Sequence, residues 1–202
     1  RHKLARLSLD SGFGPEARWE PEPVTITLGG VPVPLPPAGF LQATVEGERA
    51  LVDAVRAAVG RTGIVADLFA GLGTFALSLQ NARVYAAEAA REAILSLKAA
   101  AGGAQRHLFT EHRDLYRRPL TVGELDRFAA IVLDPPRAGA RDQIEQLARS
   151  ATPVIAYVSC NPSSFARDAK MLCEAGYRLD WIQPVGQFRW STHVELAARF
   201  SR

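Results

Sequence analysis

The sequence is poor in cysteine, lysine and methionine, and it has no long apolar run. Its 202 residues include two cysteines, Cys160 and Cys173, which are too few for a disulfide framework. No apolar stretch approaches the roughly 20 residues of a membrane-spanning helix, and the first residues lack the apolar core of a secretory signal. We therefore expect a cytoplasmic protein with no membrane partner. We expect no metal site in this chain, because such a site needs more ligands than the sequence offers.

The basic residues are almost all arginine. Only three of the 24 basic residues are lysine, and the formal net charge is +3. Arginine side chains bind phosphate and stack on bases, so this composition is compatible with a nucleic acid partner. An arginine-rich genome would produce the same bias, and the charge alone leaves both explanations open.

Prolines are concentrated near the N-terminal end. Residues 1–40 hold seven of the 13 prolines, and segments 24–28 and 31–35 have the composition of short strands. This region is too short to bury a core of its own. We predict that it is the remnant of a β-rich region that precedes a second domain.

From residue 44 onward, strand patterns alternate with helix patterns. Helical spacing predicts a helix over 45–59. Five apolar segments predict strands: 63–69, 83–88, 107–110, 128–134 and 152–159. Four further segments predict helices: 74–80, 89–101, 140–150 and 162–175. Two final strands, 177–185 and 191–200, have no helix between them. The pattern predicts an α/β fold with a mostly parallel sheet, helices on both faces and an antiparallel C-terminal edge strand.

Four distinctive residues follow predicted strands: Gly71, Glu88, Asp134 and Cys160. Crossover connections between parallel strands are right-handed, so the carboxyl ends of these strands share one edge of the sheet. Ligands of such sheets bind at that edge. We therefore expect these residues to converge in space.

The glycine turn after the first of these strands has the pattern of a nucleotide site. Gly71 and Gly73 allow a sharp turn and a close approach to a ligand, and Glu88, 21 residues after Asp67, can hold two ribose hydroxyls. Dinucleotide sites and S-adenosylmethionine sites share this pattern. The acid Asp67 suits a ligand with a cationic amino-acid end better than a pyrophosphate. S-adenosylmethionine is therefore favoured, and an NAD-dependent oxidoreductase remains an alternative.

Cys160 precedes Asn161 and Pro162, which are typical of a helix start. A helix N-terminus and nearby arginines predict a lowered pKa for its thiol. A thiolate can add to an electron-poor carbon, so Cys160 is a candidate nucleophile. Cys173 lies inside the predicted helix and is interpreted as a core residue.

Two carboxylates complete the set of candidates. Asp134 is followed by two prolines that stiffen the chain, and Arg137 stands where enzymes that methylate exocyclic amines place an aromatic residue. Glu195 lies in an apolar stretch, where a raised pKa would suit a general base. Taken singly, each segment is also compatible with an ordinary turn or edge strand.

Together the segments "DLFAGLGTF", "DPPRAG", "SCNP" and "HVE" resemble the S-adenosylmethionine-dependent RNA 5-methyluridine methyltransferase family over about residues 38–200. The resemblance implies a Rossmann-like class I methyltransferase fold, with 41–202 as the catalytic domain and 1–40 as the tail of a β-rich, RNA-binding region. It implies Cys160 as the nucleophile and Glu195 as the general base. With the two glycines of the turn, it implies these cofactor contacts: Gln42, Phe69, Gly71, Gly73, Thr74, Glu88, Asp114 and Asp134.

The resemblance also implies a reaction and its partners. A methyl group would pass from S-adenosylmethionine to C5 of a uridine in tRNA or rRNA, through a covalent adduct between Cys160 and C6. An iron–sulfur cluster would belong only to an upstream region, and a monomer is expected. Arg137, Arg141 and Arg167 are candidates for phosphate contacts. A non-catalytic RNA-binding fragment remains a further alternative.

Overall fold

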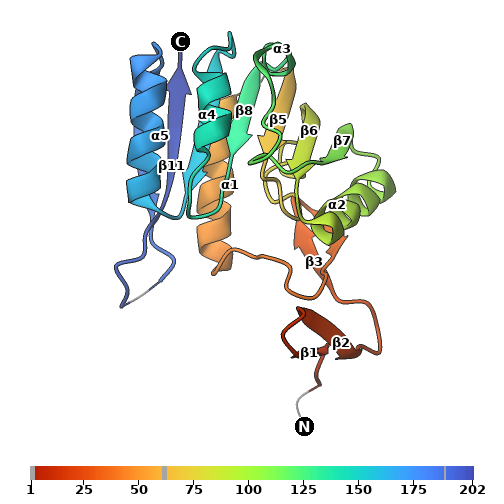
Figure 1. Ribbon diagram of the computed structural model, residues 1–202. Helices are drawn as coiled ribbons and strands as arrows, with labels where there is room; N and C mark the ends of the chain where they lie inside the picture. The colour runs from red at the N-terminus through yellow and green to blue at the C-terminus, as the bar shows by residue number, and fades with distance from the viewer. Residues whose placement is uncertain (1–2, 61–62, 189) are drawn as a thin grey trace.

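The computed structural model describes residues 3–60, 63–188 and 190–202, and it contains a sheet of seven strands (Figure 1). The strand order is β10-β11-β9-β8-β5-β6-β7. Strands β5 to β9 are parallel to their neighbours within the group, whereas β11 is antiparallel to both β9 and β10. Their bounds are β5 Ile64–Leu68, β6 Arg83–Glu88, β7 Leu108–His112, β8 Ala130–Leu133, β9 Val154–Ser159, β10 Arg178–Val185 and β11 Glu195–Ser201. The mostly parallel α/β sheet is confirmed, and the antiparallel C-terminal strand lies between β9 and β10.

Helices cover both faces of this sheet. On one face lie α1 (Val45–Val59) and α2 (Arg91–Gly103). On the other face lie α3 (Val122–Leu125), α4 (Arg141–Leu147) and α5 (Pro162–Glu174), with α4 and α5 side by side in Figure 1. Successive strand residues point to opposite faces, so each strand contributes to both cores and its sequence is almost continuously apolar.

The prolines near the N-terminal end lie in and around two hairpins that pack differently. Strands β3 (Thr25–Leu28) and β4 (Val31–Pro34) bury three side chains in the same core as α1 and α2: Leu28, Val31 and Val33. Strands β1 (Leu7–Asp10) and β2 (Pro15–Trp19) form an almost wholly exposed hairpin beyond β3 in Figure 1. Residues 25–34 thus share the core of the sheet, and the assignment of 1–40 to an RNA-binding region stays a prediction.

The prediction of a helix over 74–80 is wrong, because this segment forms a series of turns. The backbone N–H of Ala76 donates to Oδ2 of Asp67 at 2.8 Å, and the hydroxyl of Ser78 donates to the carbonyl of Thr74 at 2.6 Å. Side chains therefore take part in the local backbone pairing, which favours turns over a regular helix. The predicted helix 140–150 is also shorter. The short α3 was missed, although Thr121 and Glu124 form a capping box at its start.

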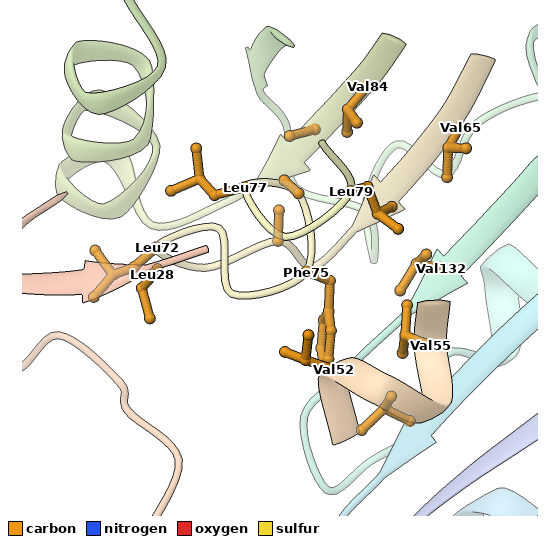
Figure 2. Packing of buried hydrophobic residues seen from close by; sticks show 14 of the residues in the cluster. Leu28, Val52, Val55, Val65, Leu72, Phe75, Leu77, Leu79, Val84 and Val132 are labelled. Atoms are coloured by element: carbon orange, nitrogen blue, oxygen red, sulfur yellow. The ribbon is translucent and has the colours of Figure 1, made fainter. Parts of the chain in front are cut away.

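The turns after Gly71 fill the space between the sheet and its first layer of helices. Leu72, Phe75 and Leu77 are buried. Figure 2 shows Phe75 beside Val52 of α1, and Leu72 close to Leu28 of β3. A segment without regular structure thus forms part of the core, and its packing fixes the floor of the site described below.

The two glycines of this turn should respond differently to substitution. Both have positive φ, +54° at Gly71 and +93° at Gly73, but only at Gly73 would a Cβ overlap a methyl group of the buried Leu97. Gly71→Ala should lower the free energy of unfolding by about 1 kcal/mol through the backbone alone. Gly73→Ala should lower it by about 2–4 kcal/mol because overpacking is added. Urea denaturation of the two variants measures the difference, and equal losses would contradict it.

Candidate active site

A cavity of about 710 Å³ opens at the carboxyl edge of the parallel strands. Its walls come from the glycine turn after β5, the ends of β6 and β8, the start of α2, and segment 36–42. Nine of the ten predicted site residues line it: Gln42, Phe69, Gly71, Thr74, Glu88, Asp114, Asp134, Cys160 and Glu195. Gly73 is not among the lining residues, since it packs against Leu97 beneath the turn.

Glu88 ties the glycine turn to the end of β6. Its Oε2 accepts the backbone N–H of Gly71 at 2.9 Å, and its Oε1 accepts the backbone N–H of Ala90 at 2.7 Å. A carboxylate has about four acceptor positions, so both oxygens retain capacity for a ligand. This arrangement suits a pair of ribose hydroxyls.

An aromatic wall stands next to Glu88 in the cavity. Phe69 has φ +64°, a left-handed conformation that is rare outside glycine, and its ring lies 5.5 Å from that of Tyr116. Tyr116 belongs to the loop after β7. Asp114 fixes the start of this loop, since its Oδ1 accepts the backbone N–H of Tyr116 at 3.0 Å. Strained backbone of this kind is concentrated at functional sites, and the wall suits a flat ring.

Gln42 is held by a buried glutamine that the sequence analysis missed. Nε2 of Gln187 donates to Oε1 of Gln42 at 2.8 Å, and Oε1 of Gln187 accepts the backbone N–H of Thr44 at 3.2 Å. The amide nitrogen of Gln42 is therefore left as a donor. No local pattern marks Gln187, because its partner lies 145 positions away in the sequence.

Asp67 does not face the cavity, contrary to the expectation that it meets the cationic end of a ligand. It is fully buried under the turn, and within the described part of the chain its Oδ1 has no hydrogen-bond partner. Burial and the charge of Asp134 raise the pKa of Asp67 to about 8. Burial and the charges of Glu195 and Glu88 raise the pKa of Asp134, which lines the cavity, to about 7.

Glu195 lies next to Cys160 because of the sheet register. Leu196 of β11 is opposite Ser159 of β9, so the next pair along these antiparallel strands is Glu195 and Cys160. Burial raises the pKa of Glu195, as predicted, and Nε2 of His193 lies 3.7 Å from its Oε1. A carboxylate and a thiol therefore share one edge of the cavity.

The prediction of a lowered thiol pKa is wrong for the free protein. Cys160 does precede α5, and Asn161 caps that helix by accepting the backbone N–H of Ser163 at 3.1 Å. Burial, and then the charges of Glu195 and Asp134, raise the pKa of the Cys160 thiol, while Arg137 opposes them. The interpretation of Cys173 as a core residue is also wrong. It is exposed, since it lies one position beyond the buried Leu172 and so faces away from the sheet.

The three candidate arginines have different surroundings. Arg137 is exposed and lines the cavity. Arg141 pairs with Glu145 at 3.3 Å on the surface of α4. Arg167 donates to Asp168 and to the carbonyl of Ala138. Arg137 is therefore the candidate that stands at the cavity, and Arg167 is used largely within the protein.

Residues 106–202 match the family model described as tRNA (Uracil-5-)-methyltransferase. This part of the chain, just under half of it, is therefore similar to the tRNA (uracil-5-)-methyltransferase family. An uncharacterized RNA methyltransferase of Zymomonas mobilis is 60% identical over 98% of this chain and 50% of its own length. Another, from Agrobacterium fabrum, is 46% identical over 96% of this chain and 47% of its own length. The chain thus spans about half the length of these relatives.

Two solved structures have the same fold. Pyrococcus abyssi tRNA (uracil-54, C5)-methyltransferase, in complex with S-adenosyl-L-homocysteine, superposes with a TM-score of 0.79 at 31% identity, over 90% of this chain and 45% of that chain. M. jannaschii TYW2, in complex with AdoMet, superposes with a TM-score of 0.69 at 17% identity, over 98% of this chain and 94% of that chain. The predicted Rossmann-like class I methyltransferase fold is confirmed.

Within residues 3–60, 63–188 and 190–202, no three His, Cys, Asp or Glu side chains are grouped as a metal site would require. In the same ranges no helix has the length and apolar character needed to cross a membrane.

The buried Asp67 should make the stability of the protein depend on pH. An unfolded aspartate has a pKa of about 3.9, whereas Asp67 in the folded chain has a pKa of about 8. Between these values the folded state holds a proton that the unfolded state lacks. The free energy of unfolding should therefore fall as pH rises from 4 to 8.

Asp67→Asn removes this titration and should reduce the loss of stability between pH 5.5 and 7.5 by about 1–2 kcal/mol. Urea denaturation at the two pH values measures the effect. Asp142→Asn, on the exposed side of α4, is the control and should keep the wild-type pH dependence. An unchanged slope in Asp67→Asn would contradict the assignment.

Proposed function

We propose that this protein transfers a methyl group from S-adenosylmethionine to C5 of a uridine in tRNA or rRNA. The observation that carries the proposal is that Cys160 and Glu195 line the same cavity as Glu88 and Gln42. A nucleophile with a base and a set of groups suited to a nucleoside cofactor are thereby placed within reach of one pyrimidine ring. The name and bound ligand of the Pyrococcus abyssi structure support the same reaction and cofactor.

The lining of the cavity fits the methyl donor better than a dinucleotide. Five acidic side chains line it, against two arginines, namely Glu88, Glu92, Asp114, Asp134 and Glu195 against Arg91 and Arg137. A pyrophosphate in these surroundings would be repelled, whereas a ligand with an ammonium and a sulfonium group would be attracted. S-adenosylmethionine supplies an electrophilic methyl group on a positively charged sulfur. The oxidoreductase alternative leaves both Cys160 and Glu195 without a role.

The chain's own residues would hold this ligand at separate points. The two oxygens of Glu88 accept from the ribose hydroxyls, and the ring of Phe69 packs against the base. The amide N–H groups of Gln42, which also lines the cavity, would donate to the ligand. Asp134, with a pKa raised to about 7, gains a partner of opposite charge and becomes ionised.

The reaction at uracil requires a nucleophile and a base because C5 is a poor nucleophile. The Cys160 thiolate adds to C6, and the electrons of the C5=C6 bond move into the ring as an enolate with carbanion character at C5. C5 then accepts the methyl group. Glu195 removes the C5 proton, the bond between sulfur and C6 breaks, and the Cys160 thiolate is restored.

The raised pKa of the thiol in the free protein has a consequence for this scheme. Burial, and then the neighbouring carboxylates, raise the pKa of the Cys160 thiol while the cavity holds no cation. A positive charge in the cavity would favour the thiolate and lower the pKa of Cys160. The nucleophile would therefore be generated mainly when the methyl donor is in place. The target base must also leave its stack, which implies base flipping or a single-stranded loop.

Cys160→Ala should abolish RNA methylation, with residual activity at least about 10³-fold below that of the parent protein, since no other thiol lines the cavity. It should retain binding of S-adenosylmethionine, measured by calorimetry. The matched control is Cys173→Ser on the exposed side of α5, which should leave both properties unchanged. Both are tested in the full-length protein with transcribed tRNA and rRNA fragments. Undiminished methylation by Cys160→Ala would remove the thiol from the mechanism.

Glu195→Gln should trap the covalent intermediate, because the amide cannot remove the C5 proton. After incubation with substrate RNA and S-adenosylmethionine, a protein–RNA adduct should be retained on denaturing gels and should be absent in Cys160→Ala/Glu195→Gln. The amide is nearly isosteric with the carboxylate, so cofactor binding should persist. If 5-methylated product still forms at the parent rate and no adduct accumulates, the assignment of the base is wrong.

A further inference from the structure

The loop after β8 is fastened through its backbone by four different side chains. This loop carries Asp134 at one end and leads into α4 at the other. Each of four consecutive residues in it makes one such hydrogen bond. The bonds are Asn161 Nδ2 to the Arg137 carbonyl at 2.9 Å, Arg167 Nη2 to the Ala138 carbonyl at 2.9 Å, the Tyr116 hydroxyl to the Gly139 carbonyl at 3.0 Å, and the Ala140 N–H to Asp168 Oδ2 at 2.8 Å.

Gly139 packs closely against two of the groups that fasten the loop. Gly139 has φ +82°, and a Cβ at this position would lie 2.6 Å from the guanidinium of Arg167 and 2.7 Å from Oδ2 of Asp168. Asp168 is fully buried, and its Oδ2 also accepts the hydroxyl of Tyr157 in β9 at 2.7 Å. The loop is thus joined to the strand and the helix on either side of Cys160.

Asn161 makes the connection closest to the nucleophile. Its Oδ1 caps α5 at Ser163, while its Nδ2 holds the Arg137 carbonyl. Its backbone N–H donates to the hydroxyl of Ser159 at 3.1 Å. One side chain therefore fixes the backbone after Cys160 and the backbone of Arg137 with respect to each other.

The hydrogen bond from Asn161 Nδ2 to the Arg137 carbonyl fixes the backbone position of Arg137. Its side chain lines the cavity together with Cys160 and Glu195. Its positive charge lowers the pKa of both of them, against the effect of burial. The influence of a charge falls with distance, so a loop that shifts outward would weaken it.

We propose that Asn161 is a positioning residue: its carboxamide fixes the backbone of Arg137 against the start of α5 and so keeps the Arg137 guanidinium beside the sulfur of Cys160. The inference rests on the proposed function in one respect, namely that the Cys160 thiolate is the nucleophile. It assigns to Asn161 a role beyond capping. Arg137, in turn, becomes a residue that favours the thiolate against burial and the neighbouring carboxylates.

The test measures the reactivity of Cys160 directly. It uses a Cys173→Ser background, so that alkylation within residues 1–202 occurs at Cys160. The rate of alkylation by iodoacetamide is followed from pH 6 to 10. Asn161→Ser keeps a good helix cap but cannot reach the Arg137 carbonyl. Asn161→Ser and Arg137→Gln should each lower the rate at pH 7.5 about threefold or more, as an increase of about half a pKa unit requires. The double variant should match the single ones, because both changes act through one charge.

Two comparisons decide whether the effect is specific. Ser163→Ala changes an exposed side chain in the same helical turn and should leave the alkylation profile unchanged. Thermal unfolding of Asn161→Ser should stay close to that of the parent, because serine and asparagine are similar caps. An unchanged profile in Asn161→Ser would overturn the proposal. So would a double variant whose effect equals the product of the single effects, since Asn161 would then act independently of Arg137.

Methylation of RNA by the full-length protein is measured in parallel. If Asn161→Ser lowers the rate constant for methylation at saturating cofactor and leaves the dissociation constant of S-adenosylmethionine unchanged, the positioning role is supported at the level of the reaction. If the parent protein methylates no RNA, the proposed function fails, whereas the alkylation profiles still decide the role of Asn161.

Discussion

The register between β11 and β9 is the constraint on which the site depends. Strands β5, β6, β8 and β9 are parallel and bring their carboxyl ends to one edge, while β11 is antiparallel and brings its first residue there. With Leu196 opposite Ser159, Glu195 falls beside Cys160. A slip of one residue would turn the Glu195 side chain to the other face of the sheet. The hydrophobic residues that follow in β11 prevent such a slip, because they are buried on both faces.

Electrostatics gives this edge its chemical character. Asp67, Asp134 and Glu195 all have raised pKa values, since burial disfavours their charged forms and repulsion between carboxylates adds to this effect at Asp67 and Asp134. Such a group is costly to ionise in the free protein and becomes favourable to ionise when a cation enters the cavity. Burial and the charges of Glu195 and Asp134 likewise raise the pKa of the Cys160 thiol. The acidic lining of the cavity and the raised pKa of the Cys160 thiol are therefore two consequences of one arrangement. Both are compatible with a positively charged methyl donor.

The sequence predicted most of the sheet, and nine of the ten residues predicted for the site line the cavity, because each lies in or beside a strand, turn or short motif. Glu88 and Cys160 follow apolar strands whose carboxyl ends must meet. What it missed depends on contacts between distant segments. Gln187 donates a hydrogen bond to Gln42, 145 positions away. Asp67 accepts the backbone N–H of Ala76, in a segment whose pattern alone predicts a helix. The pKa of Cys160 depends on burial and on charges from two separate segments, the loop after β8 and the start of β11, which no single motif contains.

The reactive groups and their electrostatic partner are held by different means. Cys160 and Glu195 follow or begin strands, so ladders of backbone hydrogen bonds fix their separation. Arg137 belongs to a loop that individual side chains fasten, and each such bond contributes only about 1 kcal/mol. Changes in those side chains can therefore alter the reactivity of the thiol while the fold and the spacing of nucleophile and base persist. The strands therefore fix the spacing of the thiol and the carboxylate, whereas the loop sets the position of the positive charge.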